Sequence, residues 1–228
     1  MDKEFSDNLV EGLVNLRRYI IKDKPHIKKY EKIRKTHQEI VDSMDDYLCE
    51  HINNGTKSRE MAICLDNSGL DIPVDLDSEN IDDKSILSEI FVYKVYPSLK
   101  SITEEYIEKH KFRNADKIKM LDAMNNSVVG LFKVINIDFD NCYVTYEDVF
   151  THKTYKIIDI TFSTIYKNLY KEKDLYVYNR LISYEDITFG TGMHIKINSD
   201  DKKFKNFLKK HNYNKYSDLY RYLYLYYL

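Results

Sequence analysis

Cysteine and histidine side chains near the end of a predicted helix are the first candidates for chemistry. Cys49 and His51 flank one position, and Cys64 follows downstream. A zinc site needs four convergent ligands, and these residues have no recognised zinc spacing. A nucleophilic cysteine needs a base or a charge that activates it, and nothing local marks Cys49, Cys64 or Cys142 in that way. We expect no metal and no enzyme activity, although the sequence leaves open a pair that converges only in the fold.

Two further motifs stop short of a ligand site. The segment Asp75-Leu76-Asp77-Ser78-Glu79 is similar to the start of a calcium loop, but Asn80 stands where glycine is needed and Ile86 where a bidentate glutamate is needed. The pair in Gly190-Thr191-Gly192 lacks the following helix that would aim backbone N–H groups at a phosphate. We read it as a strand turn, and we expect no cofactor.

Charge is segregated along the chain, although the totals nearly cancel. The 228 residues carry 35 Lys+Arg and 37 Asp+Glu, a net charge of -2. We call residues 17–35 the basic elbow, because their cations lie between two predicted helices. The candidate polyanion-binding residues are Arg17, Arg18, Lys22, Lys28, Lys29, Lys32, Arg34 and Lys35.

The basic elbow has two interpretations. Cations on one surface release condensed counterions from a phosphate backbone, which predicts nucleic-acid contact. Tyr19 and Tyr30 are placed to add the stacking that single-strand binders use, although both also fit the periodicity of a core. The alternative is an ordinary solvated helix face whose charges pair within the chain.

An acidic segment follows the basic elbow. Between Glu39 and Glu89 acids greatly outnumber bases, and residues 66–83 have no stable period, which predicts an acidic loop. This loop can pair with the basic elbow, dock on a basic protein surface or mimic nucleic acid. The candidate docking residues are Asp71, Asp75, Asp77, Glu79, Asp82 and Asp83.

The C-terminal SDLYRYLYLYYL is the densest aromatic segment. Ser217 followed by Asp218 favours a helix start, and a strand stays open as the alternative. Either form is apolar nearly all round, so it has to be buried in its own chain or in a second subunit. The candidate oligomer or packing face is Tyr216, Tyr220, Leu223 and Tyr227.

Helices are predicted for the N-terminal half. Apolar residues from Phe5 through Leu9, Leu13, Leu16 and Ile20 recur at steps of three and four, which predicts an amphipathic helix over residues 2–22. A second helix follows with Pro25 in its first turn and ends at the Asn53-Asn54-Gly55 cluster. Further helical segments are predicted at 58–65, 85–111 and 116–121.

From Val128 the pattern changes to β-branched and aromatic runs. Strands are predicted at 129–139, 142–150, 154–160, 174–181 and 188–197. Hairpin turns join the first three, and a longer crossing near 163–173 precedes the fourth. This spacing predicts a small five-stranded antiparallel barrel-like module, followed by two terminal helices at 200–211 and 217–228.

Three groups of residues in the strand region follow one pattern. They are Glu147-Asp148-Val149-Phe150-Thr151-His152 at a turn, Lys171 with Asp174 before a strand, and Arg180-Leu181 within that strand. Through them residues 128–197 resemble a small β-barrel module of uncharacterised bacterial proteins, some of which carry the SEC-C zinc motif. His152 stands where the pattern has a turn glycine, and the zinc cluster is absent from this sequence. The resemblance therefore implies a small barrel without a zinc site and implies no activity.

Together these features predict an α+β protein with a helical domain at 1–126 and the barrel-like module with its C-terminal helices at 127–228. The sequence shows no secretory signal pattern and no membrane-spanning apolar run, and its three cysteines fit reduced thiols, so we expect a cytoplasmic protein without membrane contact. The hypothesis is a non-enzymatic interaction protein of bacterial or mobile-element origin, with a protein partner or self-association. Nucleic-acid binding through the basic elbow is the alternative.

Overall fold

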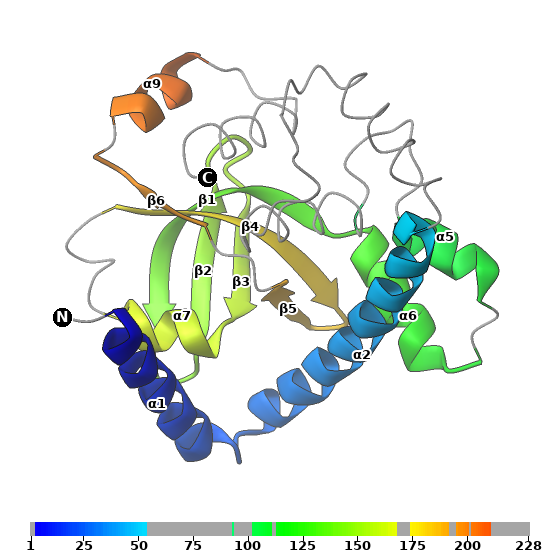
Figure 1. The fold of residues 1–228 in the computed structure, drawn as a ribbon. Coiled ribbons are helices and arrows are strands. Elements are labelled where there is room, and N and C mark those ends of the chain that lie inside the picture. The colour runs from blue at the N-terminus through cyan, green and yellow to red at the C-terminus, as the bar shows by residue number, and fades with distance from the viewer. Residues whose placement is uncertain are drawn as a thin grey trace. The chain divides into compact units, whose positions relative to one another are not determined.

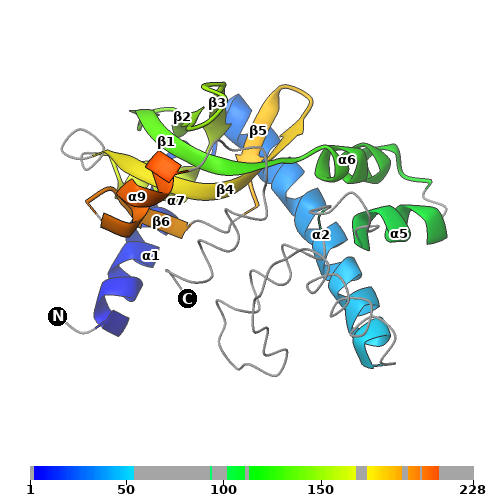
Figure 2. The ribbon, with the colours of Figure 1, turned by 90° about the horizontal axis from the view of Figure 1, so that it is seen from above.

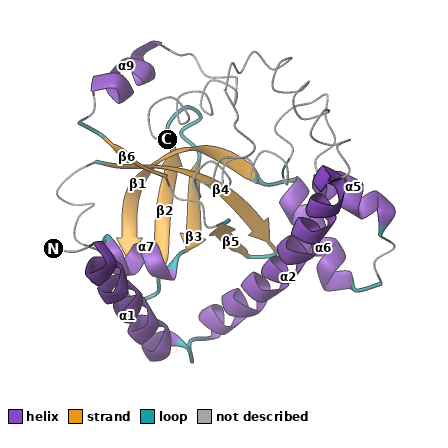
Figure 3. Ribbon diagram, viewed as in Figure 1, coloured by secondary structure: helices purple, strands orange, loops and turns teal. Residues whose placement is uncertain are grey.

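The computed structural model describes residues 3–53, 93, 102–110, 113–167, 174–191, 195–200 and 202–210. The protein is α+β, as the sequence predicts, with N-terminal helices, an antiparallel sheet and a helix after the sheet (Figures 1 and 3). Contacts divide the chain into two compact units. The first contains residues 1–34 and 128–211, and the second includes residues 35–127. The N-terminal helix thus groups with the strands.

Two long helices open the chain, close to their predicted positions. Helix α1 spans Lys3–Ile21, and α2 spans Pro25–Asn53 and continues from the first unit into the second. Pro25 occupies the first helical position, where its fixed φ suits a helix and its missing N–H costs no hydrogen bond. Ile27 and Ile33 of α2 are buried in the first unit.

The sheet has six antiparallel strands. They are β1 (Val128–Asp138), β2 (Tyr143–Asp148), β3 (Thr154–Ile158), β4 (Leu175–Tyr184), β5 (Ile187–Gly190) and β6 (Ile195–Asn198). Five of them follow the order β3-β2-β1-β4-β5, and β6 pairs with β4. The sheet curls into a half-barrel in which β3 contacts β5, and Figure 2 shows β1 and β4 as its long curved strands. The barrel-like module is therefore confirmed.

The predicted strand 188–197 is wrong as a single element, because it contains two strands. Strand β4 runs on to Tyr184 and turns at Glu185-Asp186 into β5, where Glu185 takes a left-handed φ of 54°. Strand β5 pairs with the second half of β4, and β6 pairs with the first half. One long strand thus carries two short partners along the same edge.

Part of the predicted crossing at 163–173 is also different, because residues 160–165 form a helix. Helix α7 spans Ile160–Ile165, and the Asp159 carboxylate caps it by accepting from the N–H of Phe162 (2.8 Å). Its sequence ITFSTI is rich in β-branched residues, which disfavour helix on propensity alone. The cap and the packing of α7 against α1 and β2 decide the local structure.

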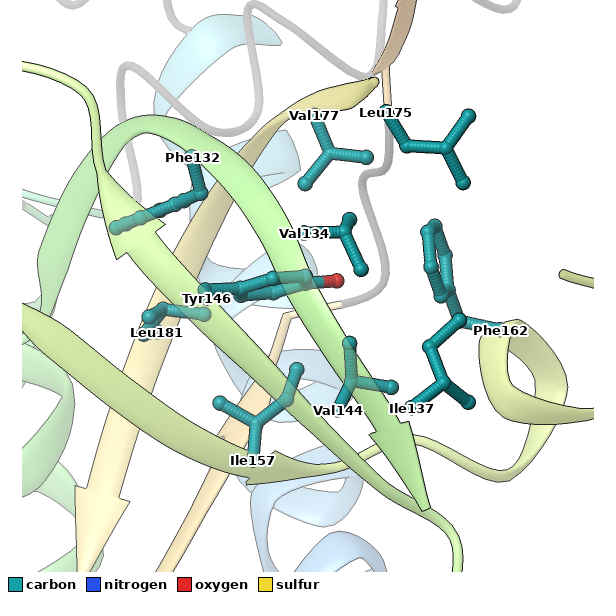
Figure 4. Packing of buried hydrophobic residues seen from close by; sticks show 10 residues of the cluster. All are labelled: Phe132, Val134, Ile137, Val144, Tyr146, Ile157, Phe162, Leu175, Val177 and Leu181. Carbon is teal, nitrogen blue, oxygen red and sulfur yellow. The ribbon is translucent and has the colours of Figure 1, made fainter. Parts of the chain in front are cut away.

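The inner face of the half-barrel holds the main core (Figure 4). Alternate residues of β1, β2 and β4 point into it, as expected for a strand with one packed face. The rings of Phe132 and Tyr146 stack there with centroids 5.5 Å apart, and Phe162 from α7 meets Tyr146 edge-on at 6.2 Å. Helix α7 therefore closes one side of this core.

The second unit is helical where it is described. It contains the later part of α2, α5 (Ile102–Lys109) and α6 (Ala115–Asn125). Asn114 caps α6 by accepting from the N–H groups of Asp116 and Lys117. Both α5 and α6 fall inside or beside the predicted helical segments, and the longer α6 begins at this cap.

Helix α9 spans Lys202–Lys210 and confirms the first predicted C-terminal helix. The second, at 217–228, lies outside the described residues. Among the described residues, no helix is both long and apolar enough to cross a membrane.

Candidate functional site

The basic elbow is the corner between α1 and α2, and two buried isoleucines fix it. Ile21 ends α1 and Ile27 lies in the first turn of α2, and each is 1% exposed. The N–H of Lys24 donates to the carbonyl of Ile21 (3.0 Å), and the carbonyl of Lys24 accepts from the N–H of Ile27 (3.0 Å). Because this corner is fixed, the position of each cation on α1 or α2 determines the side to which its side chain points.

Two cations of the corner hold the turn between β1 and β2. The Arg17 guanidinium donates to the carbonyls of Phe139 (2.5 Å) and Asp140 (3.1 Å) and lies over the Phe139 ring, 4.0 Å from its centroid. The Lys24 ammonium donates to the carbonyl of Asp140 (2.7 Å) and to the side chain of Asn141 (3.2 Å). These two charges stabilise the fold.

Two cations of α2 contact the β4–β5 hairpin in the same way. Lys29 pairs with Glu185 (2.9 Å) and with Asp186. The hydrogen bond between Lys29 and Asp186 lowers the pKa of the Asp186 carboxyl and raises the pKa of the Lys29 ammonium. Lys29, Glu185 and Asp186 all lie at the surface. Arg34 donates to the carbonyl of Gly190 (2.9 Å) at the end of β5. The sequence placed Arg17, Lys29 and Arg34 in one polyanion-binding set, and the structure shows them in contact with the sheet.

The other predicted cations face solvent. They are Arg18, Lys22, Lys28, Lys32 and Lys35. Lys28 forms an exposed ion pair with Asp23 (3.0 Å), which has little value for stability. Lys35 belongs to the second unit, so the first unit presents four exposed cations of the set.

The two tyrosines of the basic elbow have different surroundings. Tyr19 is 67% exposed, and the Lys22 ammonium lies 4.0 Å from the centroid of its ring. Tyr30 meets Phe189 of β5 edge-on at 6.4 Å, and burial raises the pKa of its hydroxyl. Only Tyr19 is therefore available for stacking on a base.

Helix α1 exposes the apolar face that the sequence pattern identifies. Leu9, Leu13, Leu16 and Ile20 are 52%, 51%, 57% and 62% exposed, and we call these four residues the apolar strip. The packed face of the helix instead contains Val14 and Ile21. An amphipathic helix ordinarily turns its apolar face to the core. Here α1 is apolar on two adjoining faces, and packing covers one of them.

Residues 24–228 match a family of unknown function, DUF7986. The chain belongs to this family. No curated protein and no solved structure matches the chain. Helix α2 and all the strands lie within the matched residues, whereas α1 precedes them. Membership of DUF7986 therefore brings no activity to the site.

This DUF7986 member has a second basic surface that the sequence analysis missed. The sequence KKFKNFLKK forms α9, where Phe204 and Phe207 are buried and Tyr176 meets Phe204 edge-on at 5.0 Å. Its exposed lysines are Lys202, Lys203, Lys205 and Lys209. The sequence contained a signal for this basic surface. Phe204 and Phe207 lie three residues apart, and every other position of the segment except Asn206 and Leu208 is a lysine. Helix α9 and the basic elbow lie on opposite sides of the sheet in Figure 1.

Of the cysteine and histidine candidates, the structure describes only the side chain of Cys142. Cys142 is fully buried in the β1–β2 turn, where its thiol approaches the carbonyl of Phe139 (3.7 Å). Cys49 and His51 lie on α2, but their side chains fall outside the description, as does Cys64. Among the described residues, no three potential metal ligands gather.

Two other predicted sets lie outside the described residues of this DUF7986 member. One is the acidic docking set, Asp71, Asp75, Asp77, Glu79, Asp82 and Asp83. The other is the aromatic C-terminal set, Tyr216, Tyr220, Leu223 and Tyr227. Both stay predictions.

Proposed function

We propose that this DUF7986 member is an interaction protein that acts by surface recognition, with α1 as its contact surface. The observation that carries the proposal is the exposure of all four residues of the apolar strip. Burial of apolar surface contributes about 25 cal/mol per Å², so a partner that covers this strip gains binding free energy. Contiguous exposed apolar residues are typical of binding sites, whereas single ones are ordinary.

The geometry of the strip fits a helix or a shallow groove. Its residues lie at i, i+4, i+7 and i+11 from Leu9 to Ile20, which is a length of about 17 Å along the helix. Such spacing is the anchor pattern of a helix that binds a groove or another helix. The contacts of Val14 and Ile21 hold α1 on the first unit, so the strip is presented from an ordered base.

A photo-reactive amino acid at Leu13 or Leu16, incorporated in the source cells, tests the proposal. Recognition through α1 should give a discrete cross-linked product from each position. Ile135, which is exposed on β1 of the same unit, provides the matched control, because it is a single exposed apolar residue away from the strip. The proposal fails if Leu13 and Leu16 yield no more product than Ile135.

Nucleic-acid binding is the second candidate function, and the four exposed cations of the first unit support it. They are Arg18, Lys22, Lys28 and Lys32. The exposed ring of Tyr19 lies beside the Lys22 ammonium, 4.0 Å from its ring centroid, and can stack on a base. If all four contact phosphates, the slope of log K against log salt for duplex DNA should include about 0.9 for each contact.

Fluorescence anisotropy with a labelled duplex at several salt concentrations tests this second function. Replacement of all four cations by glutamine should reduce the salt slope by about 3 to 4. The control replaces Lys202, Lys203, Lys205 and Lys209 of α9 by glutamine, which removes the same charge elsewhere on the unit. Equal slopes for the two variants, or no binding by the original protein, would exclude the basic elbow as the nucleic-acid site.

We also propose that the protein works in a reducing compartment of a bacterium. The free, buried thiol of Cys142 supports a reducing compartment, since the thiol is placed as a small apolar side chain. The resemblance of residues 128–197 to a bacterial module supports the origin. The genomic neighbourhood of the coding sequence tests both.

A further inference from the structure

We propose that α9 is a docking surface for an anionic lipid membrane, which meets the exposed lysines of this helix. The proposal goes beyond the function proposed above, because it concerns a different surface of the first unit and a different class of partner. Helix α9 and the basic elbow lie on opposite sides of the sheet (Figure 1). Three features of α9 carry the proposal: the charge of its exposed face, the burial of its aromatic residues and the use of lysine without arginine.

The exposed face of α9 is cationic along its whole length. Lys202, Lys205 and Lys209 follow one another at i, i+3 and i+7, so they form a row about 10 Å long on one side of the helix. Lys203 is exposed on the adjoining side, and Asn206 is the exposed residue between that side and the row. The sequence of α9 contains no aspartate or glutamate. A molecule that covers this face therefore needs negative charge.

The aromatic residues of α9 are buried in the first unit. Phe204 is 1% and Phe207 is 7% exposed, and Phe204 meets Tyr176 of β4 edge-on at 5.0 Å. Burial of the two rings fixes the packed face of α9 and so turns the lysines to solvent. No aromatic side chain of α9 remains to insert between lipid tails or to stack on a base. The contact is therefore one of charge, and it should weaken as salt is added.

Asp200 lies beside the exposed face of α9 and pairs with one of its lysines. The Lys205 ammonium is 3.8 Å from the Asp200 carboxylate, and both side chains are more than half exposed. An exposed pair of this kind contributes little to stability, so it leaves Lys205 available to a partner. Asp200 also precedes the first residue of the helix, where a negative charge interacts favourably with the helix dipole.

The charge of the whole first unit also favours an anionic surface. Residues Met1–Arg34 and Val128–His211 contain 22 Lys+Arg and 17 Asp+Glu, whereas the rest of the chain contains 13 Lys+Arg and 20 Asp+Glu. The near-neutral total of the chain therefore hides a cationic first unit. An anionic surface attracts this unit before contact is made.

The use of lysine favours a lipid surface over a duplex or an acidic protein. Arginine offers a planar fork that matches phosphates or carboxylates in fixed positions, whereas lysine carries a point charge on a flexible stem, and α9 has no arginine. Holding exposed lysines on fixed carboxylates costs side-chain entropy and yields little. An anionic leaflet is fluid and attracts lysines through its surface potential, so the lysines keep their freedom. A cluster of four to eight basic residues on an amphipathic helix is the pattern that binds such a surface.

A contact of this kind does not need a membrane-spanning segment. The expectation of no membrane contact rests on the sequence, which shows no apolar run long enough to cross a bilayer. A helix that charge holds on the surface of a membrane needs no such run. We therefore infer a reversible surface contact.

Co-sedimentation of the full chain with lipid vesicles tests the proposal. Vesicles of equal parts phosphatidylglycerol and phosphatidylcholine should bind the protein less as salt is added, and vesicles of phosphatidylcholine alone should not bind it. Each lysine at an anionic surface strengthens binding about fivefold, so replacement of Lys202, Lys203, Lys205 and Lys209 by glutamine should weaken it roughly a hundredfold or more. The matched control replaces Arg18, Lys22, Lys28 and Lys32 by glutamine. It removes the same charge on the opposite side of the sheet and should weaken binding far less.

A fluorophore introduced as an encoded amino acid tests which face meets the lipid. At Asn206 its emission should be quenched by lipids that carry a nitroxide on the headgroup, because residue 206 lies within the exposed face of α9. At Arg18, on the opposite side of the sheet, its emission should change little. Equal quenching at the two positions would overturn α9 as the docking surface. Thermal melts show whether each variant keeps its fold.

The outcomes separate this proposal from the proposed function. No binding to anionic vesicles at low salt, or equal weakening by the two glutamine variants, overturns lipid docking through α9. Binding to duplex DNA or to polyglutamate that only the α9 variant weakens, without binding to vesicles, would assign the lysines to another polyanion and also overturn it. Recognition through α1 is tested by cross-linking from Leu13 and Leu16, and it stands or fails independently of the vesicles.

Discussion

The guanidinium of Arg17 lies on the ring of Phe139 and donates to the carbonyl of that same residue, 122 positions away in the chain. The contact joins α1 to the turn between β1 and β2. The carbonyl bond and the ring contact act on one cation, so Arg17 ties α1 to the sheet through both polar and aromatic interactions. A residue of the predicted polyanion-binding set is thus part of the structural framework.

Arg17→Ala should reduce the free energy of unfolding by about 1–2 kcal/mol, because it removes a charge-assisted hydrogen bond and a cation–π contact. Urea denaturation measures the change. Arg18→Ala is the matched control, since Arg18 is the exposed neighbour and should change stability little. Equal effects from the two variants would contradict the structural role of Arg17.

The sequence identified the basic elbow, but it could not show which of its cations contact the sheet and which face solvent. Helical period shows which residues share a face, but the structural role of a face depends on what packs against it. Arg17 and Lys24 meet backbone carbonyls of a turn that lies more than a hundred residues later. Backbone acceptors carry no sequence signal. The same limit applies to α1. Its helical period identified the apolar strip as the face that packs, but the buried residues are Val14 and Ile21.

The strands were predictable in type but not in every boundary. Alternation and β-branched residues identified β1 to β3, and the turn residues between them were visible. The hairpin at Glu185-Asp186 was missed because neither residue is the glycine or asparagine that a left-handed position ordinarily selects. Two short partners on one long β4 are a tertiary arrangement, so the run 188–197 looked continuous.

His152→Gly should stabilise the protein by about 0.5–1 kcal/mol. His152 takes a left-handed φ of 56° in the β2–β3 turn. This conformation costs a residue with a Cβ about 1–2 kcal/mol, and glycine avoids that cost. The larger conformational entropy of glycine in the unfolded chain offsets part of the stabilisation. Its contact with Glu147 (3.2 Å) is exposed and contributes little. Thermal and urea denaturation measure the change. Lys153→Gly, at the next position without a positive φ, should destabilise the protein, and a gain there would refute the argument.

Gly190→Ala should destabilise the protein by about 1–3 kcal/mol through overpacking. A Cβ at residue 190 would lie 2.6 Å from the side-chain nitrogen of Asn179 and 2.9 Å from its oxygen, and Asn179 is fully buried. Gly12→Ala is the matched control. A Cβ at residue 12 meets nothing within 4 Å, so this change should stabilise the protein by up to about 1 kcal/mol.

The clash between residues 190 and 179 has its own test in a double-mutant cycle. If the amide of Asn179 is the obstacle, Asn179→Ala should cost less in the Gly190→Ala background than in the original protein. Urea denaturation of the four proteins gives the coupling energy. Strictly additive effects would show that Gly190 is required for its backbone rather than for the space beside Asn179.

Stability at low pH should depend on Asp138. The side-chain amide of Asn141 (2.9 Å) and then its backbone N–H (3.1 Å) donate to the Asp138 carboxylate and hold its pKa below the usual value. The unfolded chain therefore binds this proton more readily, so the stabilisation is complete above the unfolded pKa of about 3.9 and is lost as the pH falls through the lower folded value.

Asp138→Asn keeps an acceptor oxygen without the charge, and it should flatten the fall of unfolding free energy in urea titrations below about pH 4. Asp140→Asn makes the same change of charge at an exposed position of the same turn, and an equal flattening by both variants would assign the effect to net charge.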